Sequence, residues 1–214
     1  MRSLRGSFLV ALAVVVVGCA TPGPQLVKPP RPITDSSARF QSTGYSILPP
    51  SGPHWELYIL GANHIGFGKR DPEHYQQPSD RMHTFVVFAV SERVANADIK
   101  TMEGLMQVLD QAMGRSDPSR FKIVSRKLDP YREQETDCAR FEMVNEEWNN
   151  PHVPGVTFVA TTAGKMCRNP AAPEYVVMAL WSERLPSGHE SMLDAGLREE
   201  VNHSIGSLVF KAVR

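Results

Sequence analysis

The sequence has no excess of charge of either sign, few cysteines and no apolar run long enough to cross a bilayer. Its 214 residues contain 23 Lys and Arg against 23 Asp and Glu, so the formal net charge is zero. Proteins that bind nucleic acid as their main partner usually carry a basic excess, so nothing in the charge balance favours DNA or RNA. Apolar residues at 42% and charged residues at 21% are ordinary for one folded domain with a tail.

Signatures of the common catalytic and nucleotide-binding sites are also missing. The chain has no GxSxG nucleophile elbow, no SxxK, no Walker loop and no GxGxxG. Its seven histidines form neither HExxH nor HxH, the spacings that place two metal ligands side by side on a helix or hairpin. The sequence therefore predicts no catalytic residue, no metal site and no cofactor. One metal alternative is left open, in which His64, His74 and His83 converge around the polar loop at 70–81.

Carboxylates are plentiful between residues 133 and 147, but their spacing does not favour acid–base catalysis. Glu146 and Glu147 are neighbours on an expected strand, where successive side chains point to opposite faces. A glycosidase needs two carboxyl groups that flank one bound glycosidic bond. We therefore interpret these carboxylates as a solvated strand face.

Residues 1–19 have the pattern of a bacterial export signal. Two arginines stand close to the start, and the apolar run at 8–17 has about half of the ~20 residues that span a bilayer. The run ends in Val16-Val17-Gly18-Cys19. This motif resembles the lipobox of bacterial lipoproteins, in which an apolar residue, a small residue and Gly or Ala precede an invariant cysteine. A simple cleaved signal peptide with a chance cysteine is the alternative.

The lipobox resemblance implies an anchor in the membrane. It implies cleavage before Cys19, a diacylglycerol thioether on the Cys19 sulfur, and usually a third acyl chain, often palmitate, on the new N-terminus. Two or more acyl chains hold a protein stably in a bilayer, at about 0.8 kcal/mol per buried methylene. Ala20 follows the cysteine, which resembles the outer-membrane sorting signal of many Gram-negative lipoproteins. We therefore expect the outer membrane, with the protein facing the periplasm.

The chain then divides into three segments. Residues 1–18 are the expected lipoprotein signal peptide, 19–39 a lipidated Pro-rich tether, and 40–214 a single globular α+β domain. Five prolines lie within residues 21–32. Because proline fixes φ and removes a backbone donor, we expect this stretch to be extended and semi-rigid. Such a tether fits a domain that is held off a membrane surface.

Two cysteines, Cys138 and Cys167, are left once Cys19 is assigned to the lipid anchor. The bacterial envelope is oxidising, so a disulfide is the default expectation. Residues 137–148 and 156–167 both have strand-like patterns and flank a turn-rich stretch. A hairpin centred on this turn places the two cysteines directly opposite each other, at bridging distance. A redox-active or metal-binding pair is the alternative, but the chain has no CxxC motif.

The same hairpin register groups apolar side chains on one face. The residues on that face are Ala139, Phe141, Met143, Phe158, Ala160 and Met166. A slip of one residue would separate this set, so the grouping is an independent argument for the register. One pairing argues against it, because Arg140 would stand opposite Lys165. Closing a loop of about 30 residues is expected to stabilise the fold by roughly 3–4 kcal/mol.

Hydropathy patterns predict many strands and two helices. Strands are expected at 45–48, 55–60, 65–69, 84–90, 121–132, 137–148, 156–167, 175–181 and 208–213, and helices at 98–113 and from a capping box at 187–190 to 205. The nearly continuous apolar runs at 84–90 and 175–181 indicate central strands covered on both faces. We therefore expect an α+β fold, a mostly antiparallel twisted sheet with two main helices packed on it. This order over about 40–213 resembles the Mog1/PsbP-like fold, an α/β/α sandwich used by small accessory and binding proteins.

Two short stretches of the sequence are similar to each other. Residues 86–94 and 176–185 each contain an apolar strand that ends in a Glu-Arg pair. If the two strand ends are equivalent in space, Arg93 and Arg184 could hold an anionic ligand, because Arg suits bidentate contacts. Ordinary surface ion pairs at the ends of apolar strands are the alternative.

Together these features favour a lipid-anchored protein of the bacterial envelope with a non-catalytic binding or accessory domain. Its expected partners are the membrane, through the lipid, and an unidentified protein of the envelope. The sequence leaves two alternatives open. One is a carrier of a small ligand or metal, and the other is an envelope hydrolase whose site is assembled from residues far apart in the chain.

Overall fold

The computed structural model describes residues 26–70, 82–94, 99–150 and 153–213. The expected signal peptide, Cys19 and His74 lie outside these residues. The described part contains the strands β1 (Leu26–Pro32), β2 (Phe40–Ser42), β3 (Tyr45–Ile47), β4 (Trp55–Leu60), β5 (His64–Lys69), β6 (Thr84–Arg93), β7 (Phe121–Glu133), β8 (Thr136–Glu147), β9 (Phe158–Arg168), β10 (Tyr175–Pro186) and β11 (Val209–Phe210), and the helices α1 (Met102–Gly114) and α2 (Ala195–Gly206).

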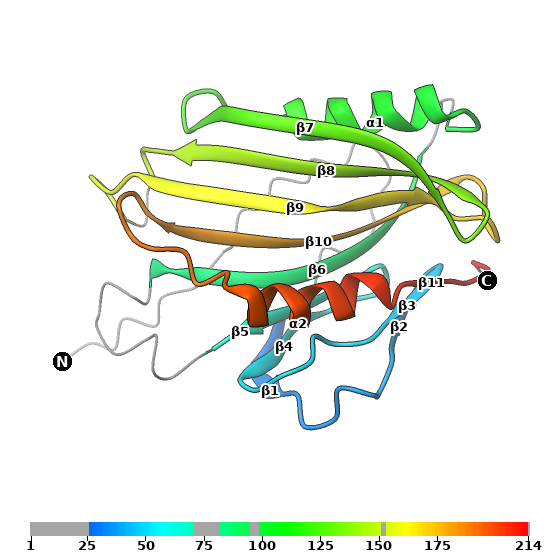
Figure 1. Cartoon of the computed structure of the whole chain (residues 1–214), viewed down its shortest axis with the longest axis horizontal. Coiled ribbons are helices and arrows are strands. Elements are labelled where there is room, and N and C mark those ends of the chain that lie inside the picture. Colours follow the sequence, from blue (N-terminus) through cyan, green and yellow to red (C-terminus); the bar gives the residue numbers. More distant parts are fainter. Residues whose placement is uncertain (1–25, 71–81, 95–98, 151–152, 214) are drawn as a thin grey trace.

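Eight of the strands form one antiparallel sheet in the order β1-β4-β5-β6-β10-β9-β8-β7 (Figure 1). The central strands are β6 and β10, the two most apolar runs of the sequence. Their position confirms the expectation, because a strand that is covered on both faces needs apolar side chains on both. The short strands β2, β3 and β11 form a separate three-stranded sheet.

The expected fold class, an α+β domain built as an α/β/α sandwich, is wrong. Of the residues that the structure describes, 49% lie in strands and 15% in helices, so the fold is mostly sheet. Among the residues described, each face of the large sheet carries one helix. A helix about 10 Å wide covers two or three strands spaced about 4.8 Å apart, so neither face has a complete helical layer. More residues are built into strands than the hydropathy patterns predict.

Helix α1 packs over β7, β8 and β9, on what we call the α1 face. Thr101 caps the helix, because its hydroxyl accepts a hydrogen bond from Gly104 N at 3.1 Å. Leu105, Leu109 and Met113 follow at intervals of four and are buried. Their apolar neighbours on the sheet include Phe88, Val90, Ala139, Phe141, Met166, Val176 and Leu180. The helical period of the sequence therefore predicted this helix correctly to within a few residues.

Helix α2 packs on the opposite face, the α2 face, where Leu197 and Val201 are buried. Their apolar surroundings include Tyr45, Ile47, Trp55, Phe67, Phe85, Trp181 and Leu208. The capping box predicted at 187–190 is wrong, because the helix begins later. Asp194 is the cap, and its Oδ1 accepts a hydrogen bond from Leu197 N at 2.7 Å.

Strand β1 lies inside the segment that composition assigns to the tether. It pairs with β4 at one edge of the large sheet, and Ile33 N continues the pairing by donating to Trp55 O at 2.8 Å. Proline is tolerated in an edge strand because its missing N–H can lie on the unpaired side. Part of the region 19–39 is therefore built into the sheet.

The predicted disulfide is present between β8 and β9. Cys138 and Cys167 stand directly opposite each other, with their Cα atoms 4.0 Å apart, and both are fully buried. The hairpin register is the predicted one, and Ala139, Phe141 and Met166 lie together in the core of the α1 face. The register could be derived from sequence because both strands belong to one local hairpin.

The like-charged pair in this hairpin, Arg140 and Lys165, is accommodated by side chains of the neighbouring strand β7. Lys165 Nζ donates to both carboxylate oxygens of Glu133 at 2.8 Å, and the Arg140 guanidinium lies over the Tyr131 ring, 4.4 Å from its centroid. Tyr131 in turn donates to Glu133 at 2.9 Å. Each positive charge therefore has a partner of its own, although the two residues are opposite each other.

Candidate functional site

The two arginines that the sequence marks as a shared ligand site lie far apart. Because β6 and β10 are antiparallel, Arg93 pairs with Tyr175 at one end and Arg184 pairs with Thr84 at the other. Nine steps of about 3.3 Å place the two backbone positions roughly 30 Å apart. One small ligand cannot contact both. The two stretches are similar in sequence. Because the strands that contain them are antiparallel, their equivalent ends lie at opposite ends of the β6–β10 pair.

The histidines of the metal alternative are also separated. His64 pairs with Val90 near the end of β6, whereas His83 directly precedes the start of that strand. His64 is half-buried, and burial lowers its pKa. His74 lies outside the described residues. The two histidines that the structure does describe, His64 and His83, lie near opposite ends of β6 and are not brought together.

A buried carboxylate organises the polar side chains around Arg184. Glu147, the last residue of β8, is 2% exposed. Its Oε1 accepts hydrogen bonds from Arg120 Nε at 2.8 Å and from Asn150 Nδ2 at 3.0 Å. Arg120 Nη2 also donates to Oε1, and Arg184 Nε donates to Oε2 at 2.6 Å. We define the Arg184 cluster as Arg120, Asn145, Glu147, Asn150, Phe158 and Arg184.

The register of β8, β9 and β10 brings these residues together on the α1 face. One row across the three strands contains Arg184, Ala160 and Asn145, and the adjacent row contains Phe158 and Glu147. The Arg184 guanidinium lies over the Phe158 ring, 3.5 Å from its centroid, and donates to Glu147 from there. An aromatic face suits a guanidinium, which is flat and weakly hydrated.

Two polar atoms of the cluster are buried without a hydrogen-bond partner. They are Nη2 of Arg184 and Oδ1 of Asn145, one a donor and the other an acceptor. Ala160, which stands between them in the row, offers neither on its side chain. A buried group that lacks its partner costs about 1–3 kcal/mol, so each such group in a native protein calls for an explanation.

The cluster carries a net positive charge. Arg120 and Arg184 contribute two positive charges and Glu147 one negative charge, a sum of +1. The two arginine side chains are each 23% exposed, whereas the carboxylate is almost fully covered. The chemistry of the cluster therefore fits an oxyanion.

Sequence reasoning missed Glu147 and Arg120. Glu147 was assigned to a solvated strand face, but it lies on the same side of β8 as Phe141 and Met143. The predicted register already implied this position for Glu147. Side chains alternate between the two faces of a strand, so residue 147 lies on the same apolar face as residues 141 and 143. Arg120 precedes β7 in a loop, and no local pattern connects it to Glu147.

A second group of buried polar side chains lies on the α2 face. His83 Nε2 is 2.7 Å from Glu183 Oε1, and both side chains are 3% exposed. Glu183 also accepts hydrogen bonds from Ser191 Oγ at 2.5 Å and from Met192 N at 2.7 Å. Burial alone would raise the pKa of Glu183, but these hydrogen bonds and the His83 charge outweigh it, so the pKa is lowered. The group holds the loop before α2 against the sheet.

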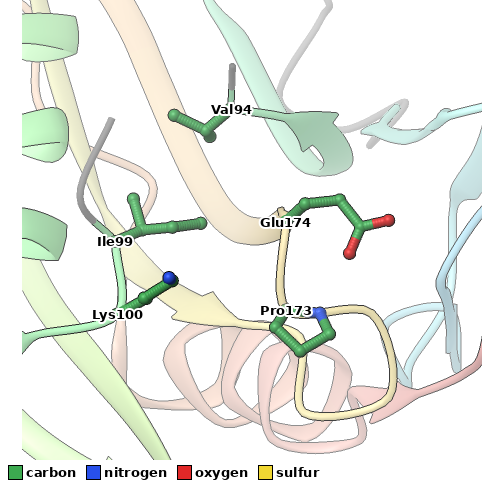
Figure 2. A pocket seen from close by; sticks show the side chains of 5 residues that line it. All are labelled: Val94, Ile99, Lys100, Pro173 and Glu174. Atoms are coloured by element: carbon green, nitrogen blue, oxygen red, sulfur yellow. The ribbon is translucent and has the colours of Figure 1, made fainter. Parts of the chain in front are cut away.

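A small hollow opens at the other end of the sheet. Val94, Ile99, Lys100, Pro173 and Glu174 line it, and its volume is about 310 Å³. Figure 2 shows the Glu174 carboxylate turned away from the apolar side chains of Val94 and Ile99. The charged groups of the lining therefore do not converge on one point, and the Arg184 cluster is the stronger candidate site.

Two further observations concern membranes and metals. None of the helices in the described ranges has the length and apolarity needed to cross a bilayer. Glu133 Oε and the sulfur atoms of Cys138 and Cys167 lie within 4.8 Å of one another. Because the two sulfurs are bonded to each other, this arrangement belongs to the disulfide and offers no thiolate ligands.

Comparison with known proteins gives a weak likeness in fold. No family model and no curated protein matches the chain. The crystal structure of the Ran-binding protein Mog1p of Saccharomyces cerevisiae is similar with a TM-score of 0.38 and 8% identity, over 78% of this chain and 96% of that one. A point mutant of Mog1 gives the same values. At this level the likeness describes an arrangement of strands and carries no argument about partners or function.

Proposed function

We propose that this chain is a lipid-anchored protein of the bacterial envelope with a non-catalytic binding or accessory domain. The observation that carries the proposal is the motif Val16-Val17-Gly18-Cys19 directly after a short apolar run. A run of that length suits an export signal, and a cysteine at its end suits acylation. The residue Ala20 favours sorting to the outer membrane, with the domain facing the periplasm.

The disulfide supports export independently of the N-terminal motif. Cys138 and Cys167 form a fully buried bond in the core of the domain. Disulfides form and persist in oxidising compartments and are rare in the cytosol, where thiols are kept reduced. A domain that contains this bond fits the periplasm, to which the signal would direct it.

The geometry of the Arg184 cluster supports binding rather than catalysis. Glu147 accepts four hydrogen bonds, from Arg120 twice, from Asn150 and from Arg184. A general base must lie within hydrogen-bond reach of the proton that it removes, and Glu147 is only 2% exposed. A carboxylate held in this way instead fixes the positions of two guanidinium groups. Guanidinium groups bind anions through charge-assisted hydrogen bonds.

The first prediction tests the anchor. The variant Cys19→Ala should lose the acyl chains, and intact-mass measurement of the chain extracted from cells should show the difference. Membrane fractionation should then find the variant either soluble in the periplasm or uncleaved, whereas the wild-type chain stays with the membranes. A matched control is Ser36→Ala, an exposed hydroxyl change that leaves the lipobox intact.

The proposal would be overturned by a wild-type chain that is exported and cleaved but carries no acyl mass. That outcome would support the alternative of a simple signal peptide. Cross-linking in intact cells, followed by mass spectrometry of the solubilised envelope, tests the partner. A stoichiometric envelope protein cross-linked to the domain would support an accessory role, and its absence would favour a carrier of a small ligand.

A further inference from the structure

We propose that the Arg184 cluster binds a small organic anion, a carboxylate that carries a hydroxyl or amino group beside it. The proposal deepens the binding role proposed above and rests on it. It starts from the two buried atoms without partners, Arg184 Nη2 and Asn145 Oδ1, which lie in one row across β8, β9 and β10.

The donor, Arg184 Nη2, specifies an oxygen with negative charge. Arg184 is held from two sides, by the Phe158 ring under its guanidinium and by Glu147 at its Nε. Nη2 is buried without a hydrogen-bond partner, and these two contacts fix the orientation of the guanidinium before a ligand arrives. A preorganised guanidinium binds a carboxylate oxygen with a short, charge-assisted hydrogen bond.

The acceptor, Asn145 Oδ1, specifies a donor on the same ligand. A simple carboxylate such as propionate has no N–H or O–H, so it would leave this oxygen unsatisfied. A hydroxyl or amino group next to the carboxylate would satisfy it. The ligand must be small, because Arg184 and Asn145 are two strand spacings apart, about 9.6 Å between backbones.

Two hydroxyl groups flank the proposed site. Ser182 and Thr162 face each other in the next row of β10 and β9, and their oxygens are 2.9 Å apart. Both residues are buried, and either hydroxyl can be the donor of this bond. Because a hydroxyl rotates, the pair can reorient one proton or lone pair toward a ligand at little cost.

The net charge favours the same class of ligand. The cluster sums to +1 with two arginines and one glutamate, so an anion of charge −1 neutralises it. Both arginine side chains keep some exposure, at 23%, so the cluster lies close to the protein surface. A neutral ligand would leave the second guanidinium charge uncompensated in a partly buried place.

Calorimetric titration of the full chain in mild detergent tests the proposal. The probes are sodium lactate and sodium propionate, which differ by one hydroxyl, with sodium chloride as the ionic control. We expect lactate to bind about tenfold more tightly than propionate, the usual effect of one hydrogen bond to a buried group. Asn145→Ala should remove this preference and leave propionate binding unchanged. Arg184→Gln should weaken both by at least about tenfold.

Arg126→Gln is the matched control, because it removes an equal charge from an exposed surface ion pair with Asp110. It should bind both probes as the wild type does. The proposal fails if neither probe binds the wild type at 20 mM, if Arg126→Gln loses as much affinity as Arg184→Gln, or if Asn145→Ala keeps the preference for lactate. Should Arg184→Gln not fold, the Asn145→Ala titration decides alone. Membrane attachment of the chain is unaffected by any of these outcomes, so the anchor and the anion site fail separately.

Discussion

Gly164 stands where β9 and β10 pass too closely for any side chain. A Cβ built at this position would lie 2.3 Å from the backbone oxygen of Ala179 and 2.6 Å from Leu180 Cα. Real Cβ atoms do not approach backbone atoms so closely, and neither strand can move without disturbing the centre of the sheet. The glycine is therefore required by packing, not by backbone conformation.

We predict that Gly164→Ala destabilises the domain by about 2–3 kcal/mol, the usual cost of overpacking a well-filled interior. Urea denaturation followed by tryptophan fluorescence measures the loss as a lower midpoint. Gly206→Ala is the control, because nothing lies within 4 Å of a Cβ at the exposed end of α2. A Gly164→Ala midpoint equal to that of the wild type would contradict the prediction.

Single residues also show where sequence reasoning reached its limit. The disulfide between Cys138 and Cys167 could be predicted, because both cysteines belong to one hairpin whose register is fixed by local pattern. The partners of Glu147 could not, because Arg120 and Arg184 reach it from a loop and from another strand. Side-chain networks across three strands leave no periodic trace in the sequence.

At the scale of elements, the position of α2 depends on polar contacts made by the loop that precedes it. The loop between β10 and α2 is fixed by Glu183, which accepts hydrogen bonds from Ser191 Oγ and Met192 N and contacts His83. The sequence predicted a capping box in this loop, because Ser and Glu three residues apart also occur at helix starts. Asp194 caps the helix instead, and the buried carboxylate of Glu183 fixes the loop that leads to it.

The lowered pKa of Glu183 predicts a dependence of stability on pH. Because its pKa is lower in the folded than in the unfolded chain, the ionised group contributes stability above its unfolded value of about 4.3, and this contribution is lost as the pH falls through the folded pKa. The urea midpoint of the wild type should therefore fall as the pH drops from about 5 to 3.

Glu183→Gln should lower the midpoint at pH 7 and flatten this acid dependence, because the amide cannot ionise. The control is Glu190→Gln, an exposed carboxylate in the same loop, which should keep the wild-type slope. If Glu183→Gln is as acid-sensitive as the wild type, the buried carboxylate does not contribute in this way.

At the scale of the whole molecule, the width of the sheet was the part least accessible to sequence. Local patterns located most strands and predicted helices on the faces of the sheet, but they did not show that β1 joins it or that each face carries only one helix among the residues described. Strand order is a long-range property, because it depends on which strands pair with each other across large separations in sequence. The same property separates Arg93 from Arg184, although the stretches that contain them are similar in sequence.

The place of β1 limits how far the domain can stand from a membrane. If Cys19 carries the lipid, only residues 20–25 connect it to Leu26, the first residue of β1. A fully extended chain of this length reaches about 25 Å. The opposite edge strand, β7, is seven strand spacings away, about 34 Å across the sheet. We therefore expect the β1 edge to lie nearer to the bilayer than the β7 edge.

Energy transfer to a lipid-bound acceptor dye measures this orientation in vesicles that carry the lipidated chain. A donor attached at Arg31→Cys, exposed in β1, should be quenched more strongly than one at Val124→Cys, which is 52% exposed in β7. A chain lengthened by twenty Gly and Ser residues after residue 25 should lose the difference, because a flexible linker of that length lets the domain rotate freely. Equal quenching at both positions in the unlengthened chain would show that the short connection does not orient the domain.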